Sequence, residues 1–175
     1  QNSIKFDRRK LNARLIKEGF GPYSPVKHVD TMRMAKGQGM FTSNKLEWLS
    51  KMTGEEKSSH KEFPGFELWV QCLKDNPKAW AEMQKYNEQD VRATEKLYTL
   101  LRPWDDKQPN LANMVDLPLE TPACTRCASL DLRRQGFRYT NVGKYQQYQC
   151  NSCGGWMRTR YTENTLAKRK NLLSN

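Results

Sequence analysis

Four cysteines in the last third of the chain have the spacing that points most directly to chemistry. Cys124 and Cys127 form one Cys-x-x-Cys pair, Cys150 and Cys153 form a second, and 22 residues separate the two pairs. Thiolates are preferred ligands of Zn²⁺, and two close pairs brought together by a hairpin make a closed tetrahedral site. We therefore predict a structural Zn²⁺ site in which all four ligands come from the protein.

A fifth cysteine, Cys72, stands alone in an apolar, helix-like stretch and is expected to be a buried core thiol. The chain shows no secretory segment, so a metal is favoured over disulfides for the paired cysteines. Asp30, before Thr31, is either a further metal ligand or the cap of a helix, and the cap is the commoner role of such an aspartate.

A tyrosine and two aspartates form the second candidate site. The stretch YNEQD places Tyr86 and Asp90 four residues apart on an expected helix, hence on one face, where a phenol and a carboxylate can address one reaction centre. A solvated helix would also produce this pattern often. Upstream, NSIKFDRRKL contains Asn2 and places Asp7 at the start of another expected helix.

The order of these motifs resembles a known family. Residues 1–104 resemble the latter part of the DnaQ-like 3'–5' exonucleases of the DEDDy branch, within the ribonuclease H-like superfamily. In that family the second motif contributes one Asp, matched by Asp7, and the third contributes Tyr-x-x-x-Asp, matched by Tyr86 and Asp90. The resemblance implies phosphodiester hydrolysis with two Mg²⁺ or Mn²⁺ ions. Asp90 would bind the water-activating ion, Asp7 would serve the other, Tyr86 would orient the water, and Asn2 would line the substrate cleft.

The family's first motif, an Asp-x-Glu on a leading strand, has no counterpart in the 175 residues. Hard divalent cations need several oxygen ligands, and two matched carboxylates of four bind them poorly. We therefore expect this polypeptide by itself to be inactive, and to be a fragment of, or a partner to, a complete exonuclease whose missing N-terminal segment supplies the first motif.

The elements that must position these residues follow from the apolar pattern. Helices are expected from Asp7 to a stop at Gly19, over 44–53, around 66–73, and from Pro77 to Arg102 as one long helix or two stacked helices. A brief strand-like run contains Val26 and Val29. The expected fold is α/β: an incomplete, helix-rich ribonuclease H-like domain followed by a small β zinc ribbon.

The predicted domains are residues 1–104 for the exonuclease domain, 105–121 for a proline-punctuated linker, 122–162 for the zinc ribbon and 163–175 for a basic tail. In the ribbon, bulky and polar residues alternate around Gly136 and Gly143, as in short antiparallel strands joined by turns. A module this small has too little core to fold unaided, so the metal would supply the missing stability.

The charge of the chain favours a polyanionic partner. There are 30 Lys and Arg against 19 Asp and Glu, and residues 107–175 alone hold 11 basic and 4 acidic residues. A merely soluble basic surface is the alternative. Arginines that bind phosphate and rings that stack on bases would contact nucleic acid, unless the rings only form the core of the ribbon. The candidate contacts in the ribbon are Arg134, Arg138, Lys144, Tyr148, Trp156 and Arg158.

The leading hypothesis is a DNA-directed 3'–5' exonuclease with a ribbon that holds single-stranded or 3'-end DNA, in proofreading, end trimming or phage replication beside a polymerase. The rival is a non-catalytic nucleic-acid-binding protein with a degenerate ribonuclease H-like domain. Two-metal chemistry reads mainly phosphate, so the choice between DNA and RNA stays open. No run of about 18 apolar residues is present. A cytoplasmic protein of a bacterial or phage-infected cell, without a membrane partner, is expected.

Overall fold

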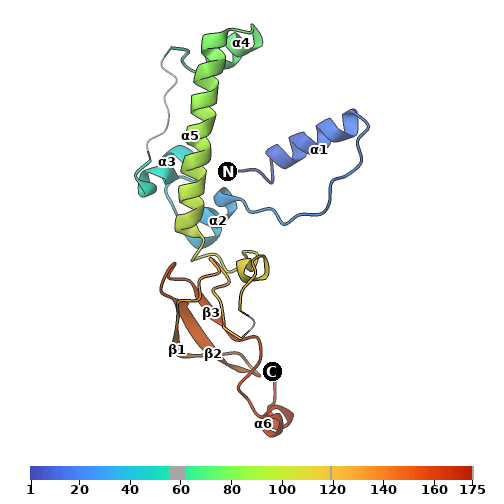
Figure 1. Cartoon of the computed structure of the whole chain (residues 1–175), viewed down its shortest axis with the longest axis vertical. Coiled ribbons are helices and arrows are strands. Elements are labelled where there is room, and N and C mark those ends of the chain that lie inside the picture. Colours follow the sequence, from blue (N-terminus) through green and yellow to red (C-terminus); the bar gives the residue numbers. More distant parts are fainter. Residues whose placement is uncertain (56–61, 119, 175) are drawn as a thin grey trace. The chain divides into compact units, whose positions relative to one another are not determined.

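The computed structural model describes residues 1–55, 62–118 and 120–174. Residue contacts divide the chain into two compact units, Gln1–Leu101 and Arg102–Asn175 (Figure 1). The predicted linker, 105–121, falls inside the second unit, and the predicted domain ranges stay predictions. Among the described residues, no helix combines the length and apolarity that crossing a membrane requires.

The first unit is built around one long helix, α5, with shorter helices packed along it (Figure 1). Helices α2, α3 and α4 all contact α5. The elements of this unit are α1 (Asp7–Lys17), α2 (Thr31–Gln38), α3 (Leu46–Ser50), the 3₁₀ turn η1 (Lys51–Thr53), α4 (Glu67–Leu73) and α5 (Pro77–Leu101).

Helix α5 begins where the sequence predicts. The Asn76 side chain accepts a hydrogen bond from the Lys78 backbone N–H at 3.0 Å, and Pro77 occupies the first helical position, where its missing N–H costs nothing. The helix then continues without a break to Leu101, so the one-helix alternative is confirmed.

Two apolar clusters hold the first unit together. In one, Leu97 and Leu101 of α5 pack with Leu49 of α3 and with Met34 and Ala35 of α2. The other lies between α4 and the start of α5 and consists of Leu68, Cys72 and Ala79. Cys72 is 5% exposed, as expected for a core thiol. The first cluster fixes α3 against α5, and this contact matters for the candidate site.

Some expected local structure of the first unit is wrong. The described residues of this unit contain no strand, and the run containing Val26 and Val29 is irregular. An extended segment becomes a strand only by pairing, and this one has no strand partner. The expected helix over 44–53 splits into α3 and η1, closed by Gly54 at φ +72°. Lys45 precedes α3 and makes no side-chain hydrogen bond to the start of the helix.

Helix α1 is the least packed element of the first unit. It ends as predicted at Gly19, whose φ of +74° suits glycine, but it has no buried residue. Leu11, Ile16 and Phe20 are all more than half exposed. The apolar spacing predicts this helix correctly, but apolar spacing alone does not bury it.

The second unit contains a three-stranded antiparallel sheet in the order β1-β2-β3 (Figure 1). The strands are β1 (Leu132–Tyr139), β2 (Lys144–Cys150) and β3 (Trp156–Arg158), and they confirm the expected small β ribbon. A 3₁₀ turn, η2 (Leu111–Asn113), precedes the sheet. A short helix, α6 (Leu166–Asn171), follows it where a basic tail was predicted.

The register of β1 shifts between Arg134 and Phe137. Gly136 lies inside this bulge with φ +65°, a conformation that glycine adopts without strain. The extra residue returns Arg134 and Phe137 to the same face of the sheet, since they pair with Tyr148 and Gln146, two residues apart on β2. The bulge therefore decides which β1 side chains share a face.

Candidate active site and metal centre

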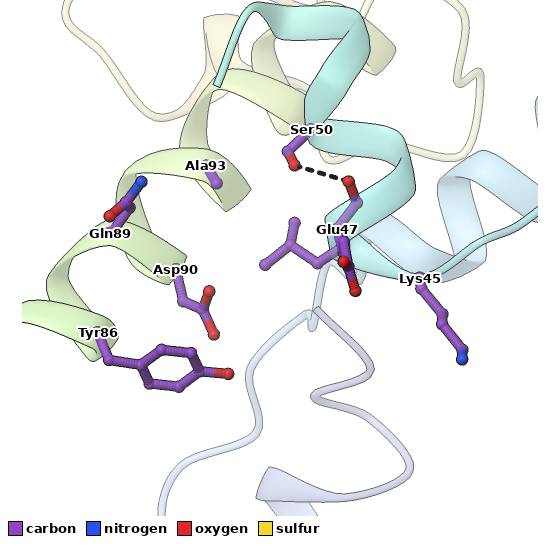
Figure 2. A pocket seen from close by; sticks show the side chains of 8 residues that line it. Lys45, Glu47, Ser50, Tyr86, Gln89, Asp90 and Ala93 are labelled. Atoms are coloured by element: carbon purple, nitrogen blue, oxygen red, sulfur yellow. Dashed lines mark hydrogen bonds between the residues drawn. The ribbon is translucent and has the colours of Figure 1, made fainter. Parts of the chain in front are cut away.

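Tyr86 and Asp90 lie one turn apart on α5 and line the same pocket, together with residues of α3 (Figure 2). Figure 2 shows the Tyr86 hydroxyl and the Asp90 carboxylate extending from α5 toward the side where Glu47 lies. Both side chains are half-buried. The pocket is lined by Lys45, Leu46, Glu47, Ser50, Tyr86, Gln89, Asp90 and Ala93.

Burial raises the pKa of the Tyr86 hydroxyl above its ordinary value. The Asp90 carboxylate raises it further, through its negative charge and by accepting a hydrogen bond, and the charge of Glu47 acts in the same direction. Tyr86 is therefore a neutral hydrogen-bond donor at physiological pH. A neutral phenol beside a carboxylate can orient a water molecule, but it cannot itself act as an anionic nucleophile.

Aromatic rings hold Tyr86 from the other side. Its ring meets that of Trp69 edge-on at 6.2 Å between centroids, and Trp69 is stacked on Phe66 at 6.0 Å. Phe66 immediately precedes α4 and Trp69 lies in its first turn, so the packing of α4 on α5 sets the position of the phenol. Phe66 is 74% exposed, and this row of rings reaches the surface.

Glu47 is the pocket carboxylate that sequence reasoning missed. The sequence pattern placed it in the first turn of an expected helix, where an acidic residue needs no further explanation. Its approach to Asp90 depends on how α3 packs on α5 through Leu49 and Leu97, which is a tertiary contact. No local signal in the sequence reports that contact.

The N-terminal candidates lie elsewhere. Asp7 is exposed at the first position of α1 and does not line the pocket. Asn2 has φ +61°, and its backbone N–H donates to Asp30 at 2.8 Å. Asp30 also accepts from the backbone N–H groups of Ile4 and Met32, at 3.2 and 3.0 Å. Asp30 is therefore the cap of α2 that also ties down residues 2–4.

The donor set of the pocket fits hard divalent cations in kind. Asp90 and Glu47 offer carboxylate oxygens, which Mg²⁺ and Mn²⁺ prefer. The number of such ligands is small, because within the described ranges only the cysteines form a group of three or more potential metal ligands. Asp90 would hold such an ion, with Glu47 as the nearest further carboxylate of the pocket.

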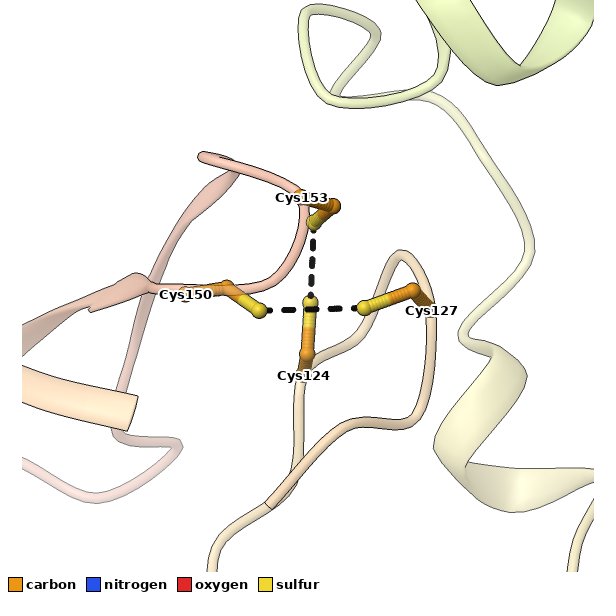
Figure 3. A group of neighbouring side chains, drawn as sticks. All are labelled: Cys124, Cys127, Cys150 and Cys153. Atoms are coloured by element: carbon orange, nitrogen blue, oxygen red, sulfur yellow. Dashed lines mark hydrogen bonds between the residues drawn. The ribbon is translucent and has the colours of Figure 1, made fainter. Parts of the chain in front are cut away.

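The four paired cysteines converge in the second unit (Figure 3). The sulfur of Cys124 lies 3.6 Å from that of Cys153, the sulfur of Cys127 lies 3.7 Å from that of Cys150, and all four lie within 4.8 Å of one another. Four sulfurs at 2.3 Å from a tetrahedral Zn²⁺ would be roughly 3.8 Å apart. The arrangement therefore fits the predicted site.

The two Cys-x-x-Cys loops have the same backbone design. In the first, the N–H of Cys124 donates to Ser129 O and the N–H of Ala128 donates to Cys124 O, both at 2.8 Å. In the second, Cys150 donates to Gly155 O and Gly154 donates to Cys150 O, both at 2.9 Å. The residue after each second cysteine is left-handed, with φ +61° at Ala128 and +77° at Gly154.

Backbone N–H groups are directed at the sulfurs, as metal-bound thiolates require. The Arg126 N–H lies 3.3 Å from the sulfur of Cys124. Burial raises the pKa of Cys150, but hydrogen bonds from the backbone N–H groups of Cys153 and Ser152 and with the side chains of Cys127 and Cys124 together lower this pKa to about 7. Burial raises the pKa of the buried Cys124 thiol and of the partly exposed Cys153 thiol above the ordinary value, and a bound cation would favour their thiolate forms.

The predicted nucleic-acid contacts of the ribbon do not form one surface. Side chains of paired residues point to the same face of a sheet, and neighbours along a strand alternate, so the register assigns each residue to a face. The six candidates divide equally. Those on one face are Arg138, Trp156 and Arg158, and those on the other are Arg134, Lys144 and Tyr148.

Comparison with known protein families gives a match. A family model described as RNase_H superfamily matches residues 2–102, which is more than half of the chain and includes Asp7, Tyr86 and Asp90. No curated protein and no solved structure matches the chain.

Proposed function

We propose, because the chain belongs to the RNase H superfamily, that its first unit is a metal-dependent 3'–5' exonuclease domain of the DnaQ-like, DEDDy type that hydrolyses phosphodiester bonds in DNA. Domains of this superfamily are generally hydrolytic nucleases that use divalent metals. The observation that carries the finer proposal is the Tyr86–Asp90 pair, one turn apart and directed into one pocket.

The residues have separate roles in this proposal. Asp90 would hold a Mg²⁺ or Mn²⁺ ion, and Asp7 would serve a second ion. Such ions activate water and stabilise the leaving 3' oxygen. Tyr86, kept neutral by Asp90 and Glu47, donates a hydrogen bond and orients the attacking water. Asn2 lines the substrate path. The zinc ribbon, whose four cysteines leave no position for substrate, holds the nucleic acid.

A second candidate function is favoured by the location of Asp7. Asp7 is exposed and does not line the pocket, which contains two carboxylates, Glu47 and Asp90. A non-catalytic nucleic-acid-binding protein with a degenerate ribonuclease H-like domain would have this arrangement. The two functions differ in whether Asp90 is needed for cleavage and for cation binding.

Substitution of Asp90 in the natural protein separates the two functions. Asp90→Asn should lower the cleavage rate of 3'-labelled single-stranded DNA by more than about 100-fold, because even indirect changes around a metal cost 10- to 100-fold. Mn²⁺ binding, followed by electron paramagnetic resonance, should weaken in parallel. Glu95→Gln, an exposed carboxylate of the same helix, is the control and should change neither quantity.

Cleavage and Mn²⁺ binding that Asp90→Asn leaves unchanged would overturn the exonuclease proposal and favour the non-catalytic function. The same assay with RNA of matched sequence reports the preferred substrate. Asp7→Asn tests the second motif independently: it should lower cleavage while leaving the Tyr86–Asp90 pocket, which it does not line, unchanged.

A further inference from the structure

One face of the three-stranded sheet combines arginines from both of its edges with two aromatic rings. Arg133 pairs with Gln149, which pairs with Trp156 on its other side, and Arg138 pairs with Tyr145. Arg158 pairs with Gln147, whose side chain lies on the same face. We call this surface the Arg138 face and define it by Arg133, Arg138, Tyr145, Gln149, Trp156 and Arg158.

The charge around the Arg138 face is of one sign. Residues 132–162 contain six Lys and Arg and no Asp or Glu. Arg133, Arg138 and Arg158 are all exposed, and no ion pair to a carboxylate involves them in the described part of the chain. Unneutralised arginines on a small sheet produce a local positive potential that a polyanion would neutralise.

Two of the three arginines are already held in place. The Arg133 guanidinium donates to the Gln149 side-chain oxygen, with Nε at 3.1 Å and Nη2 as a second donor. The Arg158 guanidinium lies 3.8 Å from the centroid of the Tyr145 ring, and its Nη1 donates to Thr159 O at 3.0 Å. Side chains that are ordered before binding lose less entropy when they bind.

Trp156 is the ring of this face that remains open. Arg158 covers one side of Tyr145, whereas Trp156 is 44% exposed at the end of the Arg133–Gln149 row. An exposed indole in a basic surface is the kind of platform on which an unpaired base stacks, and every base has a face that suits it. A duplex hides these base faces inside its own stack.

The opposite face is less suited to the same partner. Lys144 lies 3.8 Å from the centroid of the Phe137 ring, and Arg134 is the only other strand cation on that side. Tyr148 and Met157, paired across β2 and β3, are only partly exposed. This face has two strand cations against three on the Arg138 face, and its exposed rings are Phe137, over which Lys144 lies, and Tyr139 at the end of β1.

We propose that the Arg138 face binds single-stranded nucleic acid, with its arginines on the phosphates and Trp156 stacked on a base, and that the opposite face does not. The proposal names the part of the ribbon that contacts the substrate, and it rests on the proposed function in that the partner is a nucleic acid. It adds Arg133 to the sequence-predicted contacts and removes Arg134, Lys144 and Tyr148 from them.

A matched pair of arginines tests which face binds. Arg138 and Arg134 are exposed residues of the same strand on opposite faces, so Arg138→Gln and Arg134→Gln remove equal charge. Affinity for a fluorescent single-stranded DNA should fall about three- to tenfold for Arg138→Gln, with a salt dependence that is shallower by about 0.7. Arg134→Gln should stay within about twofold of the parent. Equal losses for both variants would show charge attraction without a binding face and would overturn the proposal.

The indole provides an independent readout. Single-stranded DNA should quench the tryptophan fluorescence of the full chain, Trp156→Phe should abolish most of this quenching, and Trp156→Ala should weaken binding at least about fivefold. A duplex of the same length should quench little. Quenching that survives in Trp156→Phe, or equal quenching by duplex, would contradict the stacking role. Single-stranded RNA of the same sequence shows whether the ribose matters for this face.

All binding measurements belong in an Asp90→Asn background, so that cleavage does not interfere. Measurements of cleavage and of binding together separate the two proposals. If Asp90 proves irrelevant to cleavage while Arg138→Gln alone weakens binding, the exonuclease proposal fails and the Arg138 face stands. If Asp90 is essential for cleavage and Arg138→Gln binds like the parent, the Arg138 face fails and the exonuclease proposal stands.

Discussion

Tyr86 is a phenol whose surroundings all oppose its ionisation. It is partly buried, it donates to Asp90, and Glu47 contributes a second negative charge nearby. Each of these raises its pKa above the ordinary value of 10.0. The pKa of Tyr86 therefore reports how the pocket is arranged, and it can be measured without knowledge of the substrate.

We predict that Asp90→Asn lowers the pKa of Tyr86 toward its ordinary value, because it removes the negative charge that opposes ionisation of the phenol and leaves only a weaker, neutral acceptor. The pKa is read from the alkaline absorbance titration, with Tyr86→Phe identifying the signal and Glu95→Gln as the control. A raised pKa stabilises the folded state at lower pH, and this contribution is lost as the pH rises through the folded-state value. An unchanged titration in Asp90→Asn would contradict the pairing.

The left-handed residues of the two cysteine loops give a second prediction. Gly154 has φ +77° and open space around the position of a Cβ atom, so Gly154→Ala should cost only backbone strain, about 1 kcal/mol. The melting temperature of the second unit should fall by about 4–8 °C. Ala128 already bears this strain at φ +61°, so Ala128→Gly should leave the melting temperature unchanged or raise it. Circular dichroism of the zinc-loaded protein measures both, and equal destabilisation would contradict the shared design.

At the residue scale, the sequence predicts side chains whose partners are near in sequence. Tyr86 and Asp90 share a face because a helix has 3.6 residues per turn, and the helix cap by Asp30 is an equally local property. Glu47 reaches the pocket only because α3 packs on α5, and Asp7, exposed at the start of α1, does not line it. Contacts of this kind depend on tertiary structure, which single residues do not report.

At the scale of the elements, α5 connects the candidate site with the core. Its buried side, with Leu97 at 0% exposure, anchors α3 and thereby Glu47. We predict that Leu97→Ala lowers the free energy of unfolding of the first unit by about 2–5 kcal/mol, because it removes a fully enclosed side chain. Leu100→Ala, on the same helix and 41% exposed, should cost about 1 kcal/mol or less. Urea titration compares them, and similar costs would contradict the assignment of the core side.

The start or end of a helix was predictable where a particular residue determines it. Asn76 and Pro77 fix the start of α5, and Gly19 and Gly54 end their helices because they adopt positive φ. The bulge at Gly136 was not predicted, although it decides the faces of β1. Around Val26 a strand was predicted and none forms, because strand propensity in a segment does not provide a partner strand.

At the scale of the whole molecule, the two units have different sources of stability. The first unit has two apolar clusters, whereas the largest fully buried side chains of the second are cysteines of the candidate metal centre. We predict that a strong chelator unfolds the second unit and leaves the first folded, because the metal supplies the missing core. Near-ultraviolet circular dichroism reports the loss of folded structure, and zinc analysis reports the metal that remains bound.

Substitution of single cysteines provides the control for this prediction. Cys150→Ser should reduce bound zinc from one equivalent to a small fraction, while Cys72→Ala, in the core of the first unit, should leave the zinc content unchanged and destabilise only that unit. Zinc retained by Cys150→Ser, or a second unit that stays folded without metal, would contradict the dependence on the metal.

The positions of Gln149 and Trp156 couple the binding of zinc to the binding of nucleic acid. Gln149 immediately precedes Cys150, and Trp156 follows Cys153 by three residues, so the chain segments that hold the metal also carry the centre of the Arg138 face. Ligands that favour the same folded arrangement must favour each other, and this coupling is reciprocal by thermodynamic necessity. Bound single-stranded nucleic acid should therefore raise the affinity for zinc, and loss of zinc should lower the affinity for the nucleic acid.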